Sequence, residues 1–94
     1  MEVKYSLIYH ELVIKHDIPK LSKILKTEIK NSLEKKLMFA PELFGKPLRK
    51  SLKGYWELRV RDYRVIYRIE KNNVKIFFIE HRSIVYRNVR MRYF

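Results

Sequence analysis

One stretch, residues 54–86, constrains the possible fold more than any other part of the chain, because three strand patterns follow one another in it. Residues 55–60 and 63–70 alternate apolar and polar side chains, as expected for strands whose successive side chains point to opposite faces of a sheet. Residues 74–81 are almost continuously apolar, which is typical of a strand that is covered on both faces. The stretch therefore predicts three neighbouring strands.

Turn residues separate the second and third of these patterns. Lys71, Asn72 and Asn73 form a polar break, and asparagine tolerates the left-handed backbone angles that a tight hairpin requires. A sheet of these strands would carry guanidinium groups on a rigid surface, because arginine recurs among the apolar residues at Arg59, Arg61, Arg64, Arg68 and Arg82.

The N-terminal half predicts one strand and one main helix. Residues 3–9 alternate loosely and are expected to join the same sheet, whereas Pro19 suits a short turn or a helix start. From Ser22, the predicted N-cap, to about residue 38, apolar residues step by four and lysines fill the other positions, which indicates an amphipathic helix. Pro41 is expected to end it. The apolar stripe of this helix consists of Leu21, Ile24, Leu25, Ile29, Leu33 and Leu37.

This order of elements predicts a two-layer α+β fold, in which an N-terminal strand and helices pack on a mainly antiparallel twisted sheet. A chain of 94 residues can build one modest core, so we expect a single domain over residues 1–94. Helices are expected to cover one face of the sheet and to leave the other free to bind. Phe44 and Leu48, after the helix, are expected to anchor to the core. The basic tail of residues 87–94 is expected either to pack on the sheet or to form a mobile arm, and packing is favoured because leaving its apolar side chains in water is costly: Val89, Met91, Tyr93 and Phe94.

The chain is strongly basic, with a formal net charge of +12, and all nine arginines follow residue 48. A basic surface of this kind indicates a polyanionic partner, and arginine suits bidentate phosphate contact better than lysine does. An anionic membrane or an acidic protein would also fit the charge. The sequence has no cysteine, no signal core and no apolar run near the roughly 20 residues of a membrane span, so we expect a cytoplasmic protein without disulfides.

Standard catalytic motifs are absent from the sequence. There is no glycine-rich phosphate loop, paired-histidine metal helix or nucleophile elbow, so we expect neither a metal nor another cofactor. Arginines can neutralise charge on a phosphate, histidine titrates near neutrality, and tyrosine can transfer a proton if neighbouring guanidinium groups lower its pKa. Residues of these types lie on the predicted strands or just after them, and we expect them to cleave an RNA phosphodiester: Arg59, Arg64, His81, Arg82 and Tyr86.

Other basic residues are expected to contact RNA or phosphate near the first strand of this sheet: Lys46, Arg49, Lys50, Lys53 and Arg61. Structural alternatives stay open for part of the arginine set. Arg59, Arg61 and Arg68 could instead be ordinary solvent-facing residues or could pair across strands with Glu57 and Glu70. Trp56 could be a core anchor or a stacking surface for a base.

Two segments resemble a known protein family. The run PLRKSLKGYWELRVRDYRVIYRI, followed after a hairpin by IEHRSIVYRNV, is similar to the RelE/ParE superfamily of type II toxin–antitoxin toxins, and in particular to the RelE-like mRNA interferases. The likeness spans residues 44–88. It implies a compact α+β toxin that enters the ribosomal A site and cuts mRNA there. It also implies that a small antitoxin wraps around this toxin and neutralises it.

The resemblance also implies roles for individual residues. Arg64, in the motif DYRVIY, would hold the scissile phosphate. Arg82 would stabilise the transition state, and Tyr86 would transfer a proton or stack on a base. Arg59 occupies a strand position at which some members carry lysine, so the general base would have to come from elsewhere: Lys50, Lys53, Glu57 or His81.

Two other functions stay open at this point. ParE-like members of the superfamily inhibit DNA gyrase and generally lack the nuclease residues, and the chain could follow them. It could also be a non-catalytic domain that binds RNA or the ribosome. An antitoxin for this protein is expected to carry an acidic or amphipathic segment that covers the arginine face or displaces the basic tail.

Overall fold

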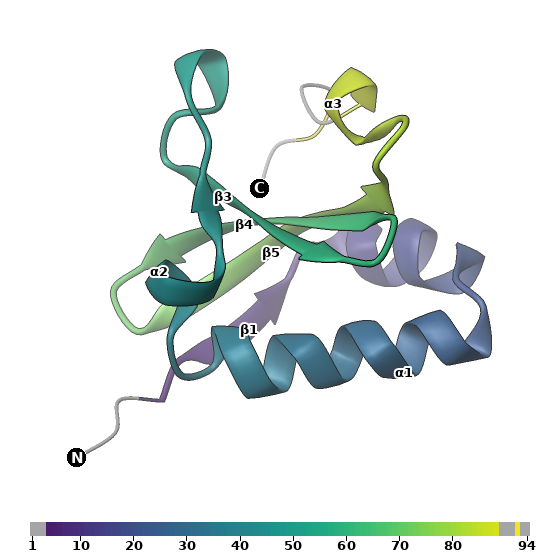
Figure 1. The fold of residues 1–94 in the computed structure, drawn as a ribbon, viewed down its shortest axis with the longest axis horizontal. Coiled ribbons are helices and arrows are strands. Elements are labelled where there is room, and N and C mark those ends of the chain that lie inside the picture. The colour runs from purple at the N-terminus through teal and green to yellow at the C-terminus, as the bar shows by residue number, and fades with distance from the viewer. Residues whose placement is uncertain (1–3, 89–91, 93–94) are drawn as a thin grey trace.

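A twisted five-stranded sheet with the strand order β1-β5-β4-β3-β2 forms the centre of the structure (Figure 1). The computed structural model describes residues 4–88 and residue 92. Strands β2 to β5 pair in antiparallel fashion, and β1 pairs in parallel with β5. The strands are β1 (Ser6–Tyr9), β2 (Lys46–Pro47), β3 (Tyr55–Val60), β4 (Tyr63–Glu70) and β5 (Asn73–His81).

The helical segments lie before the antiparallel strands, in the β2–β3 connection and after β5. They are the π-helical η1 (Val13–Asp17), the 3-10 helix η2 (Ile18–Lys20), α1 (Lys23–Ser32), the π-helical η3 (Leu33–Leu37), α2 (Pro41–Phe44), the 3-10 helix η4 (Lys50–Leu52) and α3 (Val85–Asn88). Together with the sheet they form the predicted α+β fold. Within the described residues, none of these helices combines the length and the apolar character that crossing a membrane would require.

The main helix begins where the sequence predicted. The side-chain oxygen of Ser22 accepts a hydrogen bond from the Leu25 backbone N–H at 3.2 Å, which confirms the N-cap. Helix α1 runs directly into η3, which ends at Leu37, and Pro41 begins α2 instead of ending the main helix. Ile24 was expected in the apolar stripe, but it is exposed, because its position faces solvent rather than the sheet.

Strands β3 and β4 have the predicted bounds, and β5 begins one residue earlier than predicted. The left-handed residue of the β4–β5 turn is Lys71, with a φ of 57°, rather than one of the asparagines. Arg61, with a φ of 55°, plays the same part in the β3–β4 turn. The parallel partner of β1, which sequence patterns left open, is β5.

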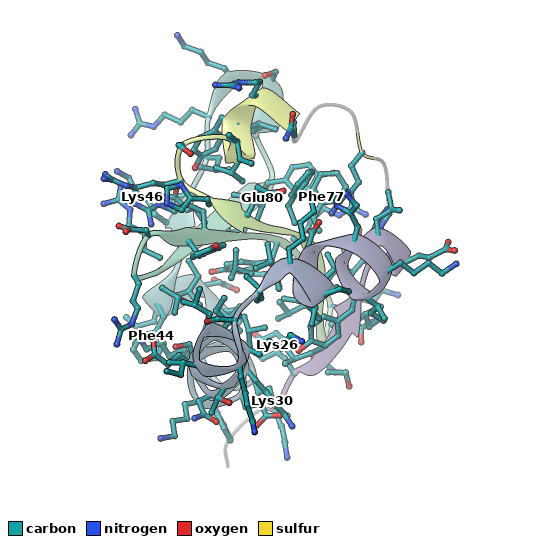
Figure 2. The ribbon with its side chains drawn as sticks, turned by 90° about the vertical axis from the view of Figure 1, so that its right-hand side faces the viewer. Lys26, Lys30, Phe44, Lys46, Phe77 and Glu80 are labelled. Atoms are coloured by element: carbon teal, nitrogen blue, oxygen red, sulfur yellow. The ribbon has the colours of Figure 1, made fainter. Side chains whose placement is uncertain are left out.

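A β-bulge between β4 and β5 divides the apolar side chains of β5 between two hydrophobic clusters, one on each face of the sheet. Tyr67 pairs with Ile76 and Ile66 with Phe78, so the β4–β5 register shifts between Ile66 and Tyr67, opposite Phe77. Phe77 and Phe78 therefore both belong to a cluster with Ile66, whereas Ile76 belongs to the larger helix-side core. Figure 2 shows Phe77 on the side of the sheet where α3 lies and Lys30, an exposed residue of α1, on the other side.

The second face of the sheet is thus not left wholly free, as we had expected. Val85 of α3 is buried in the second cluster, and Leu48 and Leu52 from the β2–β3 connection pack against it. Leu48 anchors as predicted, but Phe44 does not, because its side chain is exposed. Val89, Met91, Tyr93 and Phe94, which were expected to pack, lie outside the described residues.

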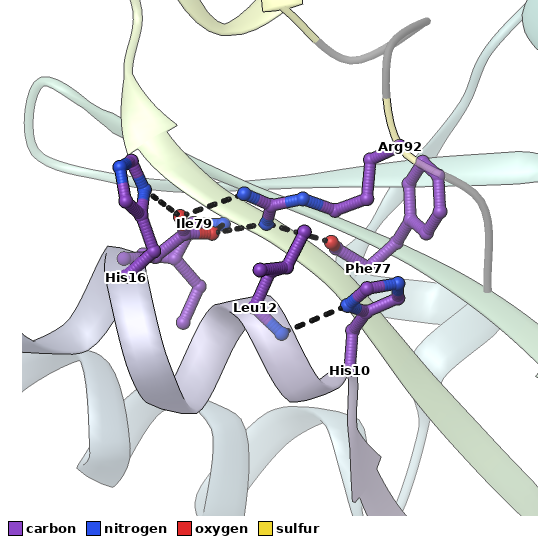
Figure 3. A network of polar contacts seen from close by, with 7 residues as sticks. His10, Leu12, His16, Phe77, Ile79 and Arg92 are labelled. Atoms are coloured by element: carbon purple, nitrogen blue, oxygen red, sulfur yellow. Dashed lines mark hydrogen bonds and ion pairs between the residues drawn. The ribbon is translucent and has the colours of Figure 1, made fainter.

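A buried ion pair connects residue 92 to the N-terminal helices (Figure 3). The guanidinium of Arg92 donates to both carboxylate oxygens of Asp17, at 2.7 and 3.1 Å, and its carbon lies 3.7 Å from the centre of the Phe78 ring. Asp17 also accepts the Ile79 backbone N–H at 2.9 Å. The guanidinium of Arg92 and the carboxylate of Asp17 are both removed from water. The hydrogen bonds between them offset the free-energy cost of burying each charge.

Candidate functional site

Cross-strand register places the arginines of the central stretch side by side. Arg59 of β3 pairs with Arg64 of β4, and Arg64 pairs with Glu80 of β5. Glu57 lies two residues before Arg59 and so shares its face of the sheet. This row of charged residues runs across three strands on the face opposite α1.

The turn after β5 and the helix α3 complete an open pocket over this row. The pocket has a volume of about 420 Å³. Its lining includes all five residues that we predicted to be catalytic, together with an acidic residue and a serine: Glu57, Arg59, Arg64, His81, Arg82, Ser83 and Tyr86. The structure thus brings these side chains together, and their catalytic roles stay predictions.

Glu57 is the centre of the polar contacts in this pocket. Its side chain is only 5% exposed, and its carboxylate accepts a hydrogen bond from the Tyr86 hydroxyl. It also accepts from Arg59 Nε at 3.3 Å and forms an ion pair with Arg64 Nε at 3.6 Å. The carboxylate is therefore a preorganised acceptor surrounded by donors, which offset its loss of water.

Arg64 is held more tightly than the other arginines of the pocket. Its side chain is 13% exposed, and one terminal nitrogen donates to the carbonyl oxygens of Arg61 and Tyr63, both at 3.0 Å. The side chains of Arg59 and Arg82 are largely exposed at the mouth of the pocket. One fixed and two accessible guanidinium groups thus face the same space, as binding of a phosphate requires.

Tyr86 has the opposite protonation behaviour to the one we predicted. Burial raises the pKa of its hydroxyl most strongly, and the hydrogen bond to Glu57 and the negative charge of that carboxylate raise it further. Arg64 and Arg59 lower this pKa, but their effect is smaller. The Tyr86 hydroxyl therefore keeps its proton at neutral pH and donates a hydrogen bond, because its pKa lies above the usual value of about 10.

His81 is oriented by the turn that follows β5. Its Nδ1 lies 2.8 Å from Ser83 Oγ and accepts the Ser83 backbone N–H at 3.1 Å, and its ring meets the edge of Tyr63 at 5.4 Å. Because Nδ1 acts as the acceptor, the ring proton of the neutral form resides on Nε2. Sequence reasoning missed Ser83, and its spacing of two residues after His81 was the available signal.

The residues predicted to contact RNA are dispersed over the surface. Arg49, Lys50 and Lys53 are exposed around η4, in the connection that projects away from the sheet in Figure 1, and do not line the pocket. Lys46, in β2, lines a neighbouring hollow. That hollow shares two residues with the pocket, so Lys46 lies nearer to it than the other three do.

Arg61 faces away from the pocket and binds the main helix. Its Nε and one terminal nitrogen donate to the two carboxylate oxygens of Glu28, the latter at 2.8 Å. Its partner is therefore neither a phosphate site on the sheet nor a cross-strand glutamate. Arg68 does form an ion pair with Glu70, but both residues lie in β4, so the pair forms within one strand and not across strands as the alternative had it. Trp56 stacks on Tyr67 with ring centres 6.4 Å apart, and it packs against the helix-side core.

Among residues 4–88 and 92, no group of three or more histidine, aspartate or glutamate side chains is placed to hold a metal ion.

The fold and the pocket agree with a match to a family of toxins. Residues 7–86 match the family described as the ParE toxin of the type II toxin–antitoxin system parDE. The match covers most of the chain. The chain therefore belongs to this family of toxins, within the RelE/ParE superfamily.

Particular relatives point to the RelE branch. The toxin RelE of Mycobacterium tuberculosis is 43% identical over 53 residues, which cover 54% of this chain and 55% of that toxin. The chain spans about half the length of the curated relatives that it matches. Among solved structures, the toxin–antitoxin complex RelBE2 of Mycobacterium tuberculosis has a chain with a TM-score of 0.79 and 29% identity, and the match covers 86% of this chain and 94% of that one.

A further solved structure supports the fold alone. A mutant of the Escherichia coli toxin RelE in the free state has a TM-score of 0.73 at 19% identity, and the match covers 95% of this chain and 93% of that one.

Proposed function

We propose that this toxin is an endoribonuclease that cuts mRNA on the ribosome through the 2′-OH, without a metal. The observation that carries the proposal is the single pocket that gathers three arginines, a histidine, a tyrosine and a buried carboxylate. In this reaction the 2′-oxygen attacks the adjacent phosphorus and the bond from phosphorus to the 5′-oxygen breaks. One proton leaves the 2′-oxygen for a base, and an acid supplies another to the 5′-oxygen.

The arginines would neutralise the charge that gathers on the phosphate. Arg64 is fixed by two carbonyl oxygens and so keeps its direction as charge develops. Arg59 and Arg82 are exposed and can close, with Arg64, on the two non-bridging oxygens when RNA binds.

Glu57 is the base that fits this geometry best among those left open. Lys50 and Lys53 do not line the pocket, whereas the Glu57 carboxylate does. A carboxylate has about four lone-pair directions, so the contacts with Tyr86, Arg59 and Arg64 leave one for a 2′-OH donor.

His81 and Tyr86 would act as donors. As an imidazolium, His81 would give its Nε2 proton to the leaving 5′-oxygen, while its Nδ1–H donates to Ser83 Oγ at 2.8 Å. Tyr86 keeps its proton because its pKa is raised, so it would hydrogen-bond or stack on a base and not act as the general base.

Mapping of mRNA ends in an in vitro translation reaction tests this proposal. We expect the wild-type toxin to cut ribosome-bound mRNA, and Arg64→Ala and Glu57→Gln to cut it roughly 10²- to 10³-fold more slowly. Arg87→Ala is the matched control, because Arg87 lies beside Tyr86 in α3, is exposed and does not line the pocket. Undiminished cleavage by both Arg64→Ala and Tyr86→Ala would rule out this pocket as the site of cleavage, and no cleavage by the wild-type toxin would rule out the nuclease.

A cognate antitoxin, the ribosome and mRNA are the partners that this function requires, and the cytoplasm is where it would act. The net charge of +12 supports an antitoxin whose acidic or amphipathic segment covers the arginine face. We expect affinity for this antitoxin to fall as salt rises. Binding that did not change with salt would show that charge neutralisation is not its mechanism.

Inhibition of DNA gyrase is the second candidate, because the family match is to ParE toxins. A supercoiling assay with purified gyrase distinguishes the two. Loss of supercoiling together with intact translation would select the gyrase function and exclude the nuclease.

A further inference from the structure

A second hollow adjoins the candidate active pocket along strand β3. It has a volume of about 290 Å³. Glu57 and Arg59 line both hollows, so the two share part of their walls. The remaining lining residues come from η3, α2, β2 and β3: Lys36, Phe44, Lys46 and Leu58. Figure 2 shows Phe44 and Lys46 along one flank of the molecule.

Phe44 is an exposed aromatic ring on a firmly anchored support. Its side chain is 48% exposed, although α2, which carries it, is fixed to the sheet. The hydroxyl of the buried Tyr67 donates to the Pro41 carbonyl oxygen at 2.6 Å. Gly45, the next residue, approaches Tyr67 so closely that a Cβ there would lie 1.6 Å from the hydroxyl oxygen. These contacts fix α2 against Tyr67, so the Phe44 ring is exposed on a backbone that is anchored on both sides.

The charge around this ring is positive. Lys36 Nζ lies 5.8 Å from the centre of the Phe44 ring, and the side chains of Lys46 and Arg59 are exposed. The one acidic residue of the lining, Glu57, already contacts Arg59, Arg64 and Tyr86. An accessible aromatic face between lysines is the combination by which proteins hold single-stranded nucleic acid, with the base on the ring and the backbone on the cations.

We propose that this hollow binds a nucleotide adjacent to the scissile phosphate of the RNA. Its base stacks on Phe44, and Lys36 and Lys46 contact the phosphate on its far side. This inference rests on the proposed nuclease function, since it extends the same RNA strand from one hollow into the next. RNA suits the lining better than a protein partner does, because three cations line the hollow and only two apolar side chains, Phe44 and Leu58, do so.

Cleavage kinetics with defined mRNAs test the subsite. We expect Phe44→Ala to lower kcat/KM on the order of tenfold, from the usual contribution of one base stack, and Phe44→Tyr to retain it. Leu43→Ala is the matched control, because Leu43 precedes Phe44 in α2, is exposed and does not line the hollow. For the charges, Lys36→Ala is compared with Lys35→Ala, which removes an exposed neighbour outside the hollow.

An mRNA with an abasic nucleotide links the effect to stacking. The abasic nucleotide is placed in turn at each position next to the scissile phosphate. At the position whose base stacks on Phe44, it should slow the wild-type toxin about tenfold and slow Phe44→Ala no further. Equal kcat/KM for Phe44→Ala and Leu43→Ala would overturn the subsite. The subsite would also be overturned if an abasic nucleotide at each position next to the scissile phosphate slowed the wild-type toxin and Phe44→Ala by the same factor.

Failure of the nuclease proposal can be told apart from failure of the subsite. If the wild-type toxin does not cut mRNA, fluorescence anisotropy with a single-stranded RNA oligonucleotide at low salt measures binding directly. Weaker binding by Phe44→Ala than by Leu43→Ala would keep the subsite, and equal binding would refute it. If Phe44→Ala weakened only the complex with an antitoxin, the hollow would belong to a protein interface and the RNA subsite would be wrong.

Discussion

The buried pair of Asp17 and Arg92 makes a sharp prediction about stability. The Asp17 side chain is fully buried and that of Arg92 is 6% exposed, so neither charge can be hydrated in the folded protein. Arg92→Ala removes the two guanidinium hydrogen bonds to Asp17, a third to the Phe77 carbonyl oxygen and the stacking on Phe78. It leaves a buried carboxylate with the Ile79 N–H and a 3.4 Å contact to His16 Nδ1.

Breaking such a pair by removing one partner typically costs about 3–5 kcal/mol. Native domains are stable by about 5–15 kcal/mol in total, so Arg92→Ala should lose a large part of the folding free energy. With an m-value of about 1–3 kcal/mol/M in urea, the midpoint of unfolding should fall by roughly 2 M.

Urea unfolding followed by fluorescence measures this loss. The chain has a single tryptophan, Trp56, which lies in β3 and packs against the helix-side core, so its emission reports on the fold. Arg87→Ala is the matched control, because Arg87 is an exposed arginine of the same C-terminal region.

The double variant Asp17→Asn with Arg92→Met completes the test. Replacing both charges removes the uncompensated carboxylate, so the double variant should be more stable than Arg92→Ala. If Arg92→Ala unfolded within about 0.5 kcal/mol of Arg87→Ala, the structure of this pair as described would be wrong.

Three further predictions follow from single contacts. Gly45→Ala should destabilise the fold by about 1–3 kcal/mol, measured by urea unfolding, because the Tyr67 hydroxyl must move and lose its buried partner. The pKa values of Tyr67 and Tyr86 are raised, so the folded state keeps protons that the unfolded state releases, and stability should fall as pH rises above about 10. Replacing both tyrosines by phenylalanine should flatten that fall, and an unchanged slope in unfolding experiments across this pH range would contradict the raised values. Arg61→Ala should change the unfolding midpoint little, and still less at high salt, because Arg61 and Glu28 have side chains 67% and 34% exposed.

Local patterns in the sequence were sufficient to predict several helices and strands. The alternation in residues 55–60 and 63–70 predicted β3 and β4 with their bounds, and Ser22 predicted the start of α1. These features depend on neighbouring side chains and on backbone geometry within a few residues, which the sequence displays directly.

The candidate site was predictable in part. Its five predicted residues do line one pocket, because Arg59 and Arg64 are register partners in a short hairpin and the other three lie at the end of β5 or just after it. The central place of Glu57 was not predictable, since it depends on α3 bringing Tyr86 back over β3, 29 residues along the chain. The direction of the Tyr86 pKa follows from that same contact and from burial, and nearby arginines in the sequence suggested the reverse.

The sequence by itself determined the α+β class, the strands of the central hairpins, the helix start and the strongly basic character of the chain. Only the tertiary structure decided that β1 pairs in parallel with β5, that a bulge divides Ile76 from Phe77, and that Arg61 and Arg92 bind distant carboxylates. The reason is physical: strand alternation and helix caps arise between near neighbours, whereas pairing, burial and protonation depend on which remote groups share a space.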